Sequence, residues 1–408
     1  MPGPLASLKV LDFSRLVPGP YATQILADLG AQVVKVEDPG PGDYMRGFPP
    51  MAGSYGAAFA YLNRGKKGLV LDLKKPAGRE AGRRLAQWAD VLVEGFRPGV
   101  MEGLGLGWDQ LWPENPRLIY CSITGYGQSG PHALRAGHDL GYEALAGLLS
   151  LGGAARRVGQ ASPPVLDREA GQPAMPSVPV ADLAGGGLWA VVAILAALRE
   201  ADRTGRGQVL DVSMHAGVLA FLGFDGANRL AEGETTRQSP SVFSGDHPAY
   251  SIYRCACGGR LAVAALEAKF WTRLCSAAGV EGVPDALLLP PSEWAPLKTR
   301  LQAIFETRTR SEWVEHLASL DTCVEPVLDV REAFDHPQAR YRGAAWEVPT
   351  EGGTVVRQPA FPVAFSATPA APGGAAPRPG QHTDEVLREA GLADDEIARL
   401  RSAGAFGE

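Results

Sequence analysis

The chain has 408 residues, a formal net charge of −6, 45% hydrophobic residues and 21% charged residues. This composition is typical of a soluble globular protein, and the length exceeds what one ordinary hydrophobic core supports, so we expect two domains. The acidic balance argues against a nucleic-acid-binding protein, which would usually present a basic face.

The five cysteines are scattered along the chain, and only Cys255 and Cys257 lie close together. One such pair, with no second pair at ligand spacing, is a weak metal signal, so we expect reduced cysteines and no metal site. The N-terminal stretch MPGPLASLKVLDFS lacks the pattern of a signal peptide, and the longest apolar run, 188–198, is too short to span a bilayer. We therefore expect a cytoplasmic protein without a membrane partner.

Strands and helices alternate along the first half of the chain. Apolar runs predict strands at 8–13, 31–36, 69–73, 91–94, 117–122 and 208–214, with helices at 21–29, 76–89 and 183–200. This alternation is typical of a parallel sheet covered by helices on both faces. We predict an α/β fold with a doubly wound, Rossmann-like large domain over 1–230.

The pattern changes beyond residue 230. A polar stretch over 232–246 predicts a linker, and a hairpin over 250–265 followed by helical patterns predicts a smaller α+β domain over 246–348. The last part, 355–408, is expected to return to the large domain through a strap rich in Pro, Gly and Ala, followed by two short helices. Residues 153–180 predict a long surface loop.

The stretch after the strand at 117–122 is rich in glycine. Gly125, Gly127 and Gly130 match the spacing of a dinucleotide fingerprint. We reject that interpretation because Pro131 follows at once, no helix opens directly, and no acidic residue closes a following strand at the required distance.

The helical pattern resumes after Gly137, which places His138 and Asp139 at a helix N-terminus. A proton-transfer group beside free backbone N–H groups suits carbon-acid chemistry. Asp182 stands in the same way at the start of the apolar helix at 183–200. The plainer alternative is that both aspartates only cap helices and that His138 is a surface loop residue.

Nine segments together carry a resemblance that runs nearly end to end. They are VPGPYATQILADLGAQVVKVE, LNRGKKGLVLDLK, VEGFRPGVMEGLGLG, NPRLIYCSITGYGQSGP, AGHDLGYEALAG, PVADLAGGGLWAVVAILAAL, TGRGQVLDVSM, AVAALEAKFW and PGQHTDEVL. In their order and number they resemble the family III CoA-transferases (CaiB/BaiF), and within that fold the α-methylacyl-CoA racemases. The resemblance implies an acyl-CoA thioester substrate, no other cofactor and an interlocked homodimer.

Two chemistries compete within this family. The transferases use an aspartate as nucleophile through an aspartyl-CoA anhydride, and Asp182 stands in its place. The racemases add a histidine in a GHDxxY motif, which matches Gly137–Tyr142 here, and this motif favours a racemase of 2-methylacyl-CoA thioesters. A third class, a non-catalytic acyl-CoA-binding protein, stays open.

The resemblance also assigns roles to single residues. His138 and Asp182 would exchange the α-proton on opposite faces of the substrate, the N–H of Asp139 would hold the enolate, and Glu267 would hydrogen-bond His138. The residues assigned to CoA or substrate contacts are Leu16, Val17, Asn63, Arg64, Lys66, Arg97 and Tyr142. Gly65, between Arg64 and Lys66, would free backbone for a phosphate.

Three features depart from the family pattern. Asp38 and Gly103 stand where basic residues are common, so positive charge is missing near the expected nucleotide. The loop at 153–178 is longer than in the racemases and is expected to reshape the acyl pocket.

Overall fold

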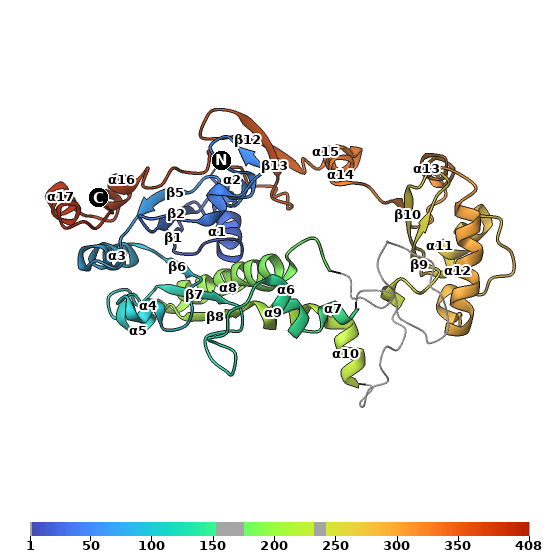
Figure 1. Ribbon diagram of the computed structural model, residues 1–408, viewed down its shortest axis with the longest axis horizontal. Coiled ribbons are helices and arrows are strands. Elements are labelled where there is room, and N and C mark those ends of the chain that lie inside the picture. The colour runs from blue at the N-terminus through green and yellow to red at the C-terminus, as the bar shows by residue number, and fades with distance from the viewer. Residues whose placement is uncertain (1, 152–174, 232–241, 408) are drawn as a thin grey trace. The chain divides into compact units, whose positions relative to one another are not determined.

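A computed structural model describes residues 2–151, 175–231 and 242–407 (Figure 1). These residues form two compact units, which we call the first unit (Met1–Ala146, Pro176–Phe221 and Pro337–Glu408) and the second unit (Gly147–Met175 and Leu222–His336). Residues 337–348, which we placed in the smaller domain, therefore belong with the first unit. Most of the predicted loop at 153–178 and of the predicted linker at 232–246 lies outside the described residues.

The first unit is built on one six-stranded sheet in which every neighbouring pair of strands is parallel. The strand order along the sheet is β5-β2-β1-β6-β7-β8. The strands are β1 (Lys9–Asp12), β2 (Gln32–Glu37), β5 (Lys67–Val70), β6 (Val91–Glu94), β7 (Ile119–Thr124) and β8 (Val209–Ser213). The order reverses direction between β1 and β6, and such a switch point opens a crevice at the carboxyl ends of the strands. The predicted parallel sheet is confirmed.

Helices cover both faces of this sheet, because alternate strand residues point to opposite sides. Leu11, Val34 and Leu92 belong to a core shared with α3 and the C-terminal helices, while α1 contacts β1, β2 and β6 and α8 contacts β7 and β8. The helices of this unit are α1 (Pro18–Asp28), α2 (Ala57–Leu62), α3 (Pro76–Trp88), α4 (Val100–Gly103), α5 (Trp108–Leu111), α6 (Asp139–Leu145), α8 (Trp189–Thr204), α9 (Met214–Phe221), α15 (Pro337–Tyr341), α16 (Thr383–Glu389) and α17 (Asp394–Ser402).

Several short elements were not predicted from the sequence. They are the 3₁₀ turn η1 (Tyr44–Gly47), the strand pair β3 (Met51–Ala52) and β4 (Tyr55–Gly56), and the hairpin of β12 (Ala345–Pro349) and β13 (Val355–Pro359). The hairpin is tied to the core by Arg64, whose guanidinium donates to the side chain of Gln358 at 3.0 Å and to the carbonyl of Pro359 at 2.9 Å.

The helix that begins near Asp182 is not a regular α-helix at its start. Ala181–Leu188 is a π-helix, η2, which continues directly into α8. Three consecutive glycines in η2 allow close packing: a Cβ on Gly217 of α9 would lie 2.1 Å from the carbonyl oxygen of Gly185. The start of the helix is therefore fixed by backbone contact with α9.

Replacing Gly217 by alanine is expected to lower the free energy of unfolding by about 2–4 kcal/mol, because backbone must move to admit the methyl group. The same shift would displace Asp182 and lower any activity that depends on it. Thermal unfolding measures the first effect. Gly103→Ala is the matched control, since a Cβ there meets no atom within 4 Å; equal losses in both variants would contradict the close packing.

By length and composition alone, η2 and α8 together (Ala181–Thr204) match a membrane span, as no other helix of the described residues does. This helix is longer than the apolar run at 188–198. Its residues Ala190, Ile194 and Ala197 are buried in the first unit. A core helix meets the same two criteria, so the match is weak support for a membrane.

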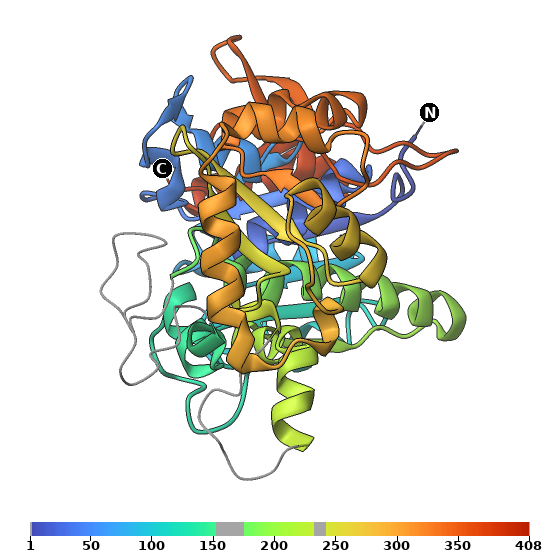
Figure 2. The same cartoon turned by 90° about the vertical axis from the view of Figure 1, so that its right-hand side faces the viewer.

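The second unit contains a three-stranded antiparallel sheet in the order β11-β10-β9, packed against α12 (Figure 2). Trp271, Trp294, Phe305 and Trp313 dominate its separate core. The predicted hairpin and the helical patterns after it are confirmed. Its elements are α7 (Leu148–Leu151), α10 (Gly223–Ala231), η3 (Val242–Ser244), β9 (Tyr250–Arg254), β10 (Arg260–Ala264), α11 (Ala268–Ala277), η4 (Ala286–Leu288), α12 (Pro291–Phe305), α13 (Arg310–Leu317), β11 (Val324–Pro326) and α14 (Val330–Asp335).

Candidate active site

The start of α6 meets the start of η2 within the first unit. His138 is the exposed N-cap residue of α6, with an extended backbone. The carboxylate of Asp139, the next residue, accepts the backbone N–H of Asp182 at 2.9 Å. The structure therefore brings three of the four predicted catalytic residues close together, since Asp139 follows His138 in the chain and contacts Asp182.

A fourth residue, Glu143, belongs to the same place and was missed by our sequence reasoning. It is buried one turn after Asp139 on α6, and its carboxyl group accepts the backbone N–H groups of Val180, at 3.2 Å, and of Ala181. Two carboxyl groups of α6 thus satisfy three N–H groups at the start of η2. The side chains of one helix thus cap the N-terminus of another, and this fixes the start of η2 and with it the position of Asp182.

The closeness of the three carboxyl groups raises the pKa of two of them, Asp182 and Glu143. Burial, with the negative charges of Asp139 and Glu143, raises the pKa of Asp182 to about 7. Burial and the adjacent Asp139 likewise raise the pKa of Glu143. Near neutral pH the carboxyl group of Asp182 therefore exists in both protonation states, which is what a group that both removes and returns a proton requires.

The aromatic ring of Tyr142 fills the space between α6 and the glycine-rich loop. A Cβ on Gly125 or on Gly137 would lie 2.4 or 2.5 Å from this ring, so both positions need glycine. Tyr126 packs edge-on against Tyr142, with 5.1 Å between ring centroids. Burial, with the negative charge of Asp182, raises the pKa of Tyr142 to about 12, so its hydroxyl stays protonated as a potential donor. Gly125, one of the three glycines that resembled a nucleotide fingerprint, thus leaves room for this ring, as Gly137 does.

A second part of the site is a cavity of about 550 Å³ at the switch point of the sheet. Segments that follow the carboxyl ends of four strands line it. These are 13–15 after β1, 37–43 after β2, 71–75 after β5 and Phe96 after β6. Phe13, Phe96 and Leu104 give it apolar walls. Its charged lining residues are the cations Arg15, Lys74 and Lys75 and the carboxylates Glu37, Asp38, Asp43 and Asp72. A crevice at this place in a doubly wound sheet is the usual ligand site.

Asn63, Arg64 and Lys66 are buried and satisfied within the chain. Arg64 forms an ion pair with Asp28 at 2.6 Å, and Lys66 forms one with Asp12 at 3.1 Å. The side-chain oxygen of Asn63 accepts a hydrogen bond from Lys66 at 3.0 Å. Their predicted contacts with CoA stay a prediction that this placement does not support.

Our interpretation of Gly65 was wrong. Its backbone N–H is not available to a phosphate, because it donates a hydrogen bond to the carbonyl of Gly374 at 2.8 Å. Gly65 has a φ of +70°, and a Cβ on it would lie 2.8 Å from the Cα of Gly373, so it is glycine because the C-terminal strap crosses here. The motif around Gly65 holds the strap rather than a ligand.

The remaining predicted residues are placed as follows. Leu16 and Val17 form the turn after β1, where both pack partly buried against Met45 and Phe59. Arg97 is close enough to Tyr142 for its positive charge to oppose the rise in the pKa of that tyrosine. Glu267 is the exposed N-cap residue of α11 in the second unit, so its hydrogen bond to His138 in the first unit stays a prediction.

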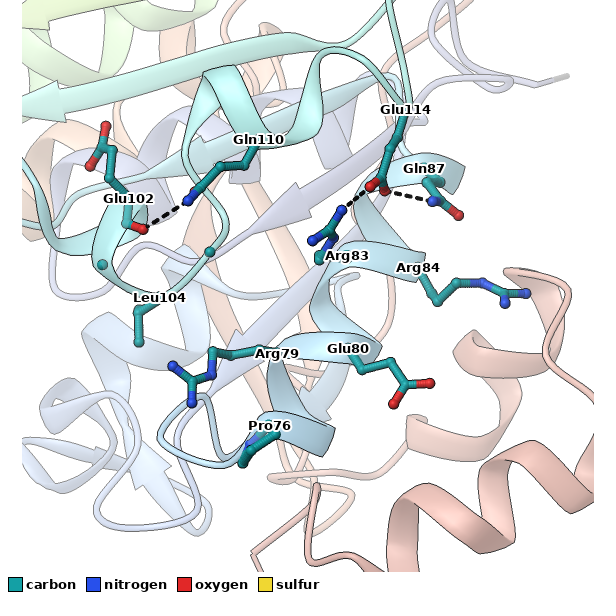
Figure 3. A pocket seen from close by; sticks show the side chains of 12 residues that line it. Pro76, Arg79, Glu80, Arg83, Arg84, Gln87, Glu102, Leu104, Gln110 and Glu114 are labelled. Atoms are coloured by element: carbon teal, nitrogen blue, oxygen red, sulfur yellow. Dashed lines mark hydrogen bonds and ion pairs between the residues drawn. The ribbon is translucent and has the colours of Figure 1, made fainter.

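A larger hollow of about 660 Å³ lies over α3 and the turn between α4 and α5 (Figure 3). Most of its charged side chains are paired: Arg83 forms an ion pair with Glu114, and Arg84 forms one with Glu396 of α17. Glu80 is engaged by Arg399 of α17 at 2.5 Å. Such a hollow, with its charges already neutralised, is a weaker ligand site than the cavity at the switch point.

Comparison with known proteins gives a consistent result. The model of CoA-transferase family III matches residues 5–383. The human α-methylacyl-CoA racemase is 36% identical over 98% of this chain and 96% of its own length, and the human succinyl-CoA:glutarate CoA-transferase is 32% identical over 98% and 89%. A CaiB/BaiF family protein from Brucella suis superposes with a TM-score of 0.79 at 29% identity, covering 96% of this chain and all of that one.

Proposed function

This chain belongs to CoA-transferase family III, and on that premise we propose that it is a racemase that inverts the α-carbon of 2-methylacyl-CoA thioesters. The observation that carries the proposal is the carboxyl group of Asp182. Burial and two neighbouring carboxyl groups bring its pKa to about 7, and its backbone N–H is held by Asp139, the residue that follows His138. A nucleophilic aspartate works best fully ionised, whereas a proton carrier works best half-protonated.

In the proposed reaction, neutral His138 removes the α-proton from one face of the thioester, and the electron pair moves onto the carbonyl oxygen. The resulting enolate is held by the backbone N–H of Asp139. The protonated carboxyl group of Asp182 then returns a proton to the opposite face of the α-carbon. One bond to hydrogen breaks and one forms, so only the configuration changes, and the roles reverse for the other enantiomer.

The cavity at the switch point takes the nucleotide of CoA in this proposal. Its apolar walls suit a purine ring, and its cations suit phosphate groups. Asp38 lines this cavity, and its carboxylate accepts the backbone N–H of Gly42 at 2.9 Å, so its negative charge has to be offset by the cations there.

We further propose a cytoplasmic homodimer. Three apolar side chains at helical spacing on η2 and α8, Leu188, Val192 and Leu195, are 43%, 49% and 37% exposed. An apolar stripe of this kind is typical of an interface between subunits. A second copy of the chain, as the family resemblance implies, would cover it.

The decisive experiment is incubation of one enantiomer of a 2-methylacyl-CoA with the protein in D₂O. We expect deuterium at the α-carbon together with loss of optical purity, without any added acid. Transfer of CoA to added succinate or glutarate, with no deuterium uptake, would instead establish a CoA-transferase that uses Asp182 as nucleophile. Neither reaction with any thioester, despite binding, would indicate an acyl-CoA-binding protein.

A further inference from the structure

Three cations line the cavity at the switch point, Arg15, Lys74 and Lys75, and of these Arg15 is the one that lies over aromatic rings among the described residues. Arg46 is paired with Glu37 at 2.5 Å and Lys35 with Asp43 at 2.9 Å. Arg15, in contrast, forms no ion pair with any carboxylate of the residues that the structure describes. Its charge is therefore free to meet an anion in the cavity that it lines.

Two aromatic rings hold the guanidinium group of Arg15. It lies 5.2 Å from the centroid of Tyr44 and 5.9 Å from that of Phe96, and it donates a hydrogen bond to the Tyr44 hydroxyl at 3.4 Å. Aromatic faces attract a cation without neutralising it. This setting orders the side chain while its remaining N–H groups stay available, and arginine presents such groups in a fork that fits phosphate oxygens.

The backbone that carries Arg15 is held in an unusual conformation. The next residue, Leu16, has a φ of +66°, in the left-handed region that leucine rarely adopts. Its N–H donates to both carboxylate oxygens of Asp43 at 3.2 Å. Lys35 bridges the same carboxylate, at 2.9 Å, and the carbonyl of Ser14, at 3.1 Å. This ion pair is fully buried, and Asp43 also accepts the backbone N–H of Met45 at 3.1 Å, beside Tyr44.

From this arrangement we propose that Arg15 binds a phosphate group of CoA, and that Lys35 and Asp43 are positioning residues that hold its turn. The strained turn sends Leu16 into the core while Ser14 and Arg15 face the cavity. Arg15 thereby supplies positive charge that is missing at Asp38 and Gly103. The inference rests on the proposed binding of CoA but on neither racemase nor transferase chemistry.

The first test measures binding of free CoA to Arg15→Gln, Arg15→Lys and the parent protein by calorimetry. We expect the dissociation constant to rise about tenfold or more for Arg15→Gln and less for Arg15→Lys. Repeating the titration with 3′-dephospho-CoA identifies the phosphate. If Arg15→Gln and the parent protein bind this ligand equally well, Arg15 contacts the 3′-phosphate. If Arg15→Gln still binds it more weakly than the parent protein does, Arg15 contacts the diphosphate. Arg203→Gln, an exposed arginine of α8, is the control and should not change binding.

The second test compares acyl-CoA with the acyl-pantetheine thioester, which lacks the nucleotide. Arg15→Gln should raise KM for the first substrate only. Asp43→Asn should do the same, and Leu16→Gly should restore most of the loss in the double variant, because glycine adopts the left-handed conformation without strain.

The inference is overturned if Arg15→Gln binds CoA as tightly as the parent protein, or if it impairs both thioesters equally. A parent protein that binds no CoA would contradict the proposed function itself, so the two failures are distinguishable. Loss of stability in Asp43→Asn without any rescue by Leu16→Gly would assign Lys35 and Asp43 to stability alone.

Discussion

Replacing His138 by alanine is expected to abolish racemisation, with a loss of at least about 10³-fold in kcat, because no other group removes the proton from that face. One enantiomer should still exchange its α-proton slowly, since Asp182 remains to act on the opposite face. Chiral analysis of the product and mass spectrometry of deuterium uptake in D₂O, starting from each enantiomer separately, measure the two effects.

A second histidine of the same loop offers a matched control. His132 packs against Tyr126, with 5.4 Å between ring centroids, and has no role in the proposed reaction. His132→Ala should keep most of the activity. If His138→Ala racemises at the parent rate, or if it loses activity no more than His132→Ala does, proton transfer by His138 is wrong. If His138→Ala still transfers CoA to a free acid, this result supports the CoA-transferase interpretation instead.

The sheet of the first unit was predictable because its strands are short, continuous apolar runs separated by helical patterns. Buried parallel strands need such runs, and 91–94 was predicted with the bounds that β6 has. The order of the strands was not readable, since it depends on contacts between distant segments. The small elements, such as β3 and β4, carry too few residues for a periodic pattern.

The candidate site was predictable in part. The GHDxxY motif placed His138, Asp139 and Tyr142 correctly on one helix start, and the approach of Asp182 came from the family resemblance. Glu143 escaped because a single glutamate on a helix is usually solvated. The signal that would have found it is its spacing of four from Asp139, which puts both carboxyl groups on one face of α6.

The basic motif at Arg64 and Lys66 shows the opposite error. Charged residues beside a glycine suggested a phosphate site, but both cations are buried against carboxylates, with exposed fractions of 1% and 3%. Sequence cannot distinguish a lysine that meets a ligand from one that meets Asp12 across the fold. Arg15, which carries no motif of this kind, lines the cavity together with Lys74 and Lys75.

Asp182→Asn is expected to abolish racemisation while making the folded protein more resistant to unfolding at alkaline pH. The pKa of Asp182 is about 7 in the folded state against 3.8 for an ordinary aspartate. Below about pH 4 the carboxyl group is protonated in both states, and the substitution changes little. As the pH rises from 4 towards 7, the unfolded chain releases this proton and the folded chain retains it. The free energy of unfolding of the parent protein therefore falls over this range, and above pH 7 it falls no further on account of Asp182.

The size of the effect follows from the shift, at roughly 1.4 kcal/mol for each pKa unit. We expect the free energy of unfolding of Asp182→Asn to exceed that of the parent by about 2–4 kcal/mol at pH 8 and by much less at pH 5. Urea unfolding at both values measures it, and Asp202→Asn, at the exposed end of α8, is the control. An advantage that is equal at both pH values, or present in the control, would show that the carboxyl groups around Asp182 do not hold it partly protonated. The proposed function would then lose its main support, because an ordinary ionised aspartate at this helix start is better suited to nucleophilic attack than to proton return.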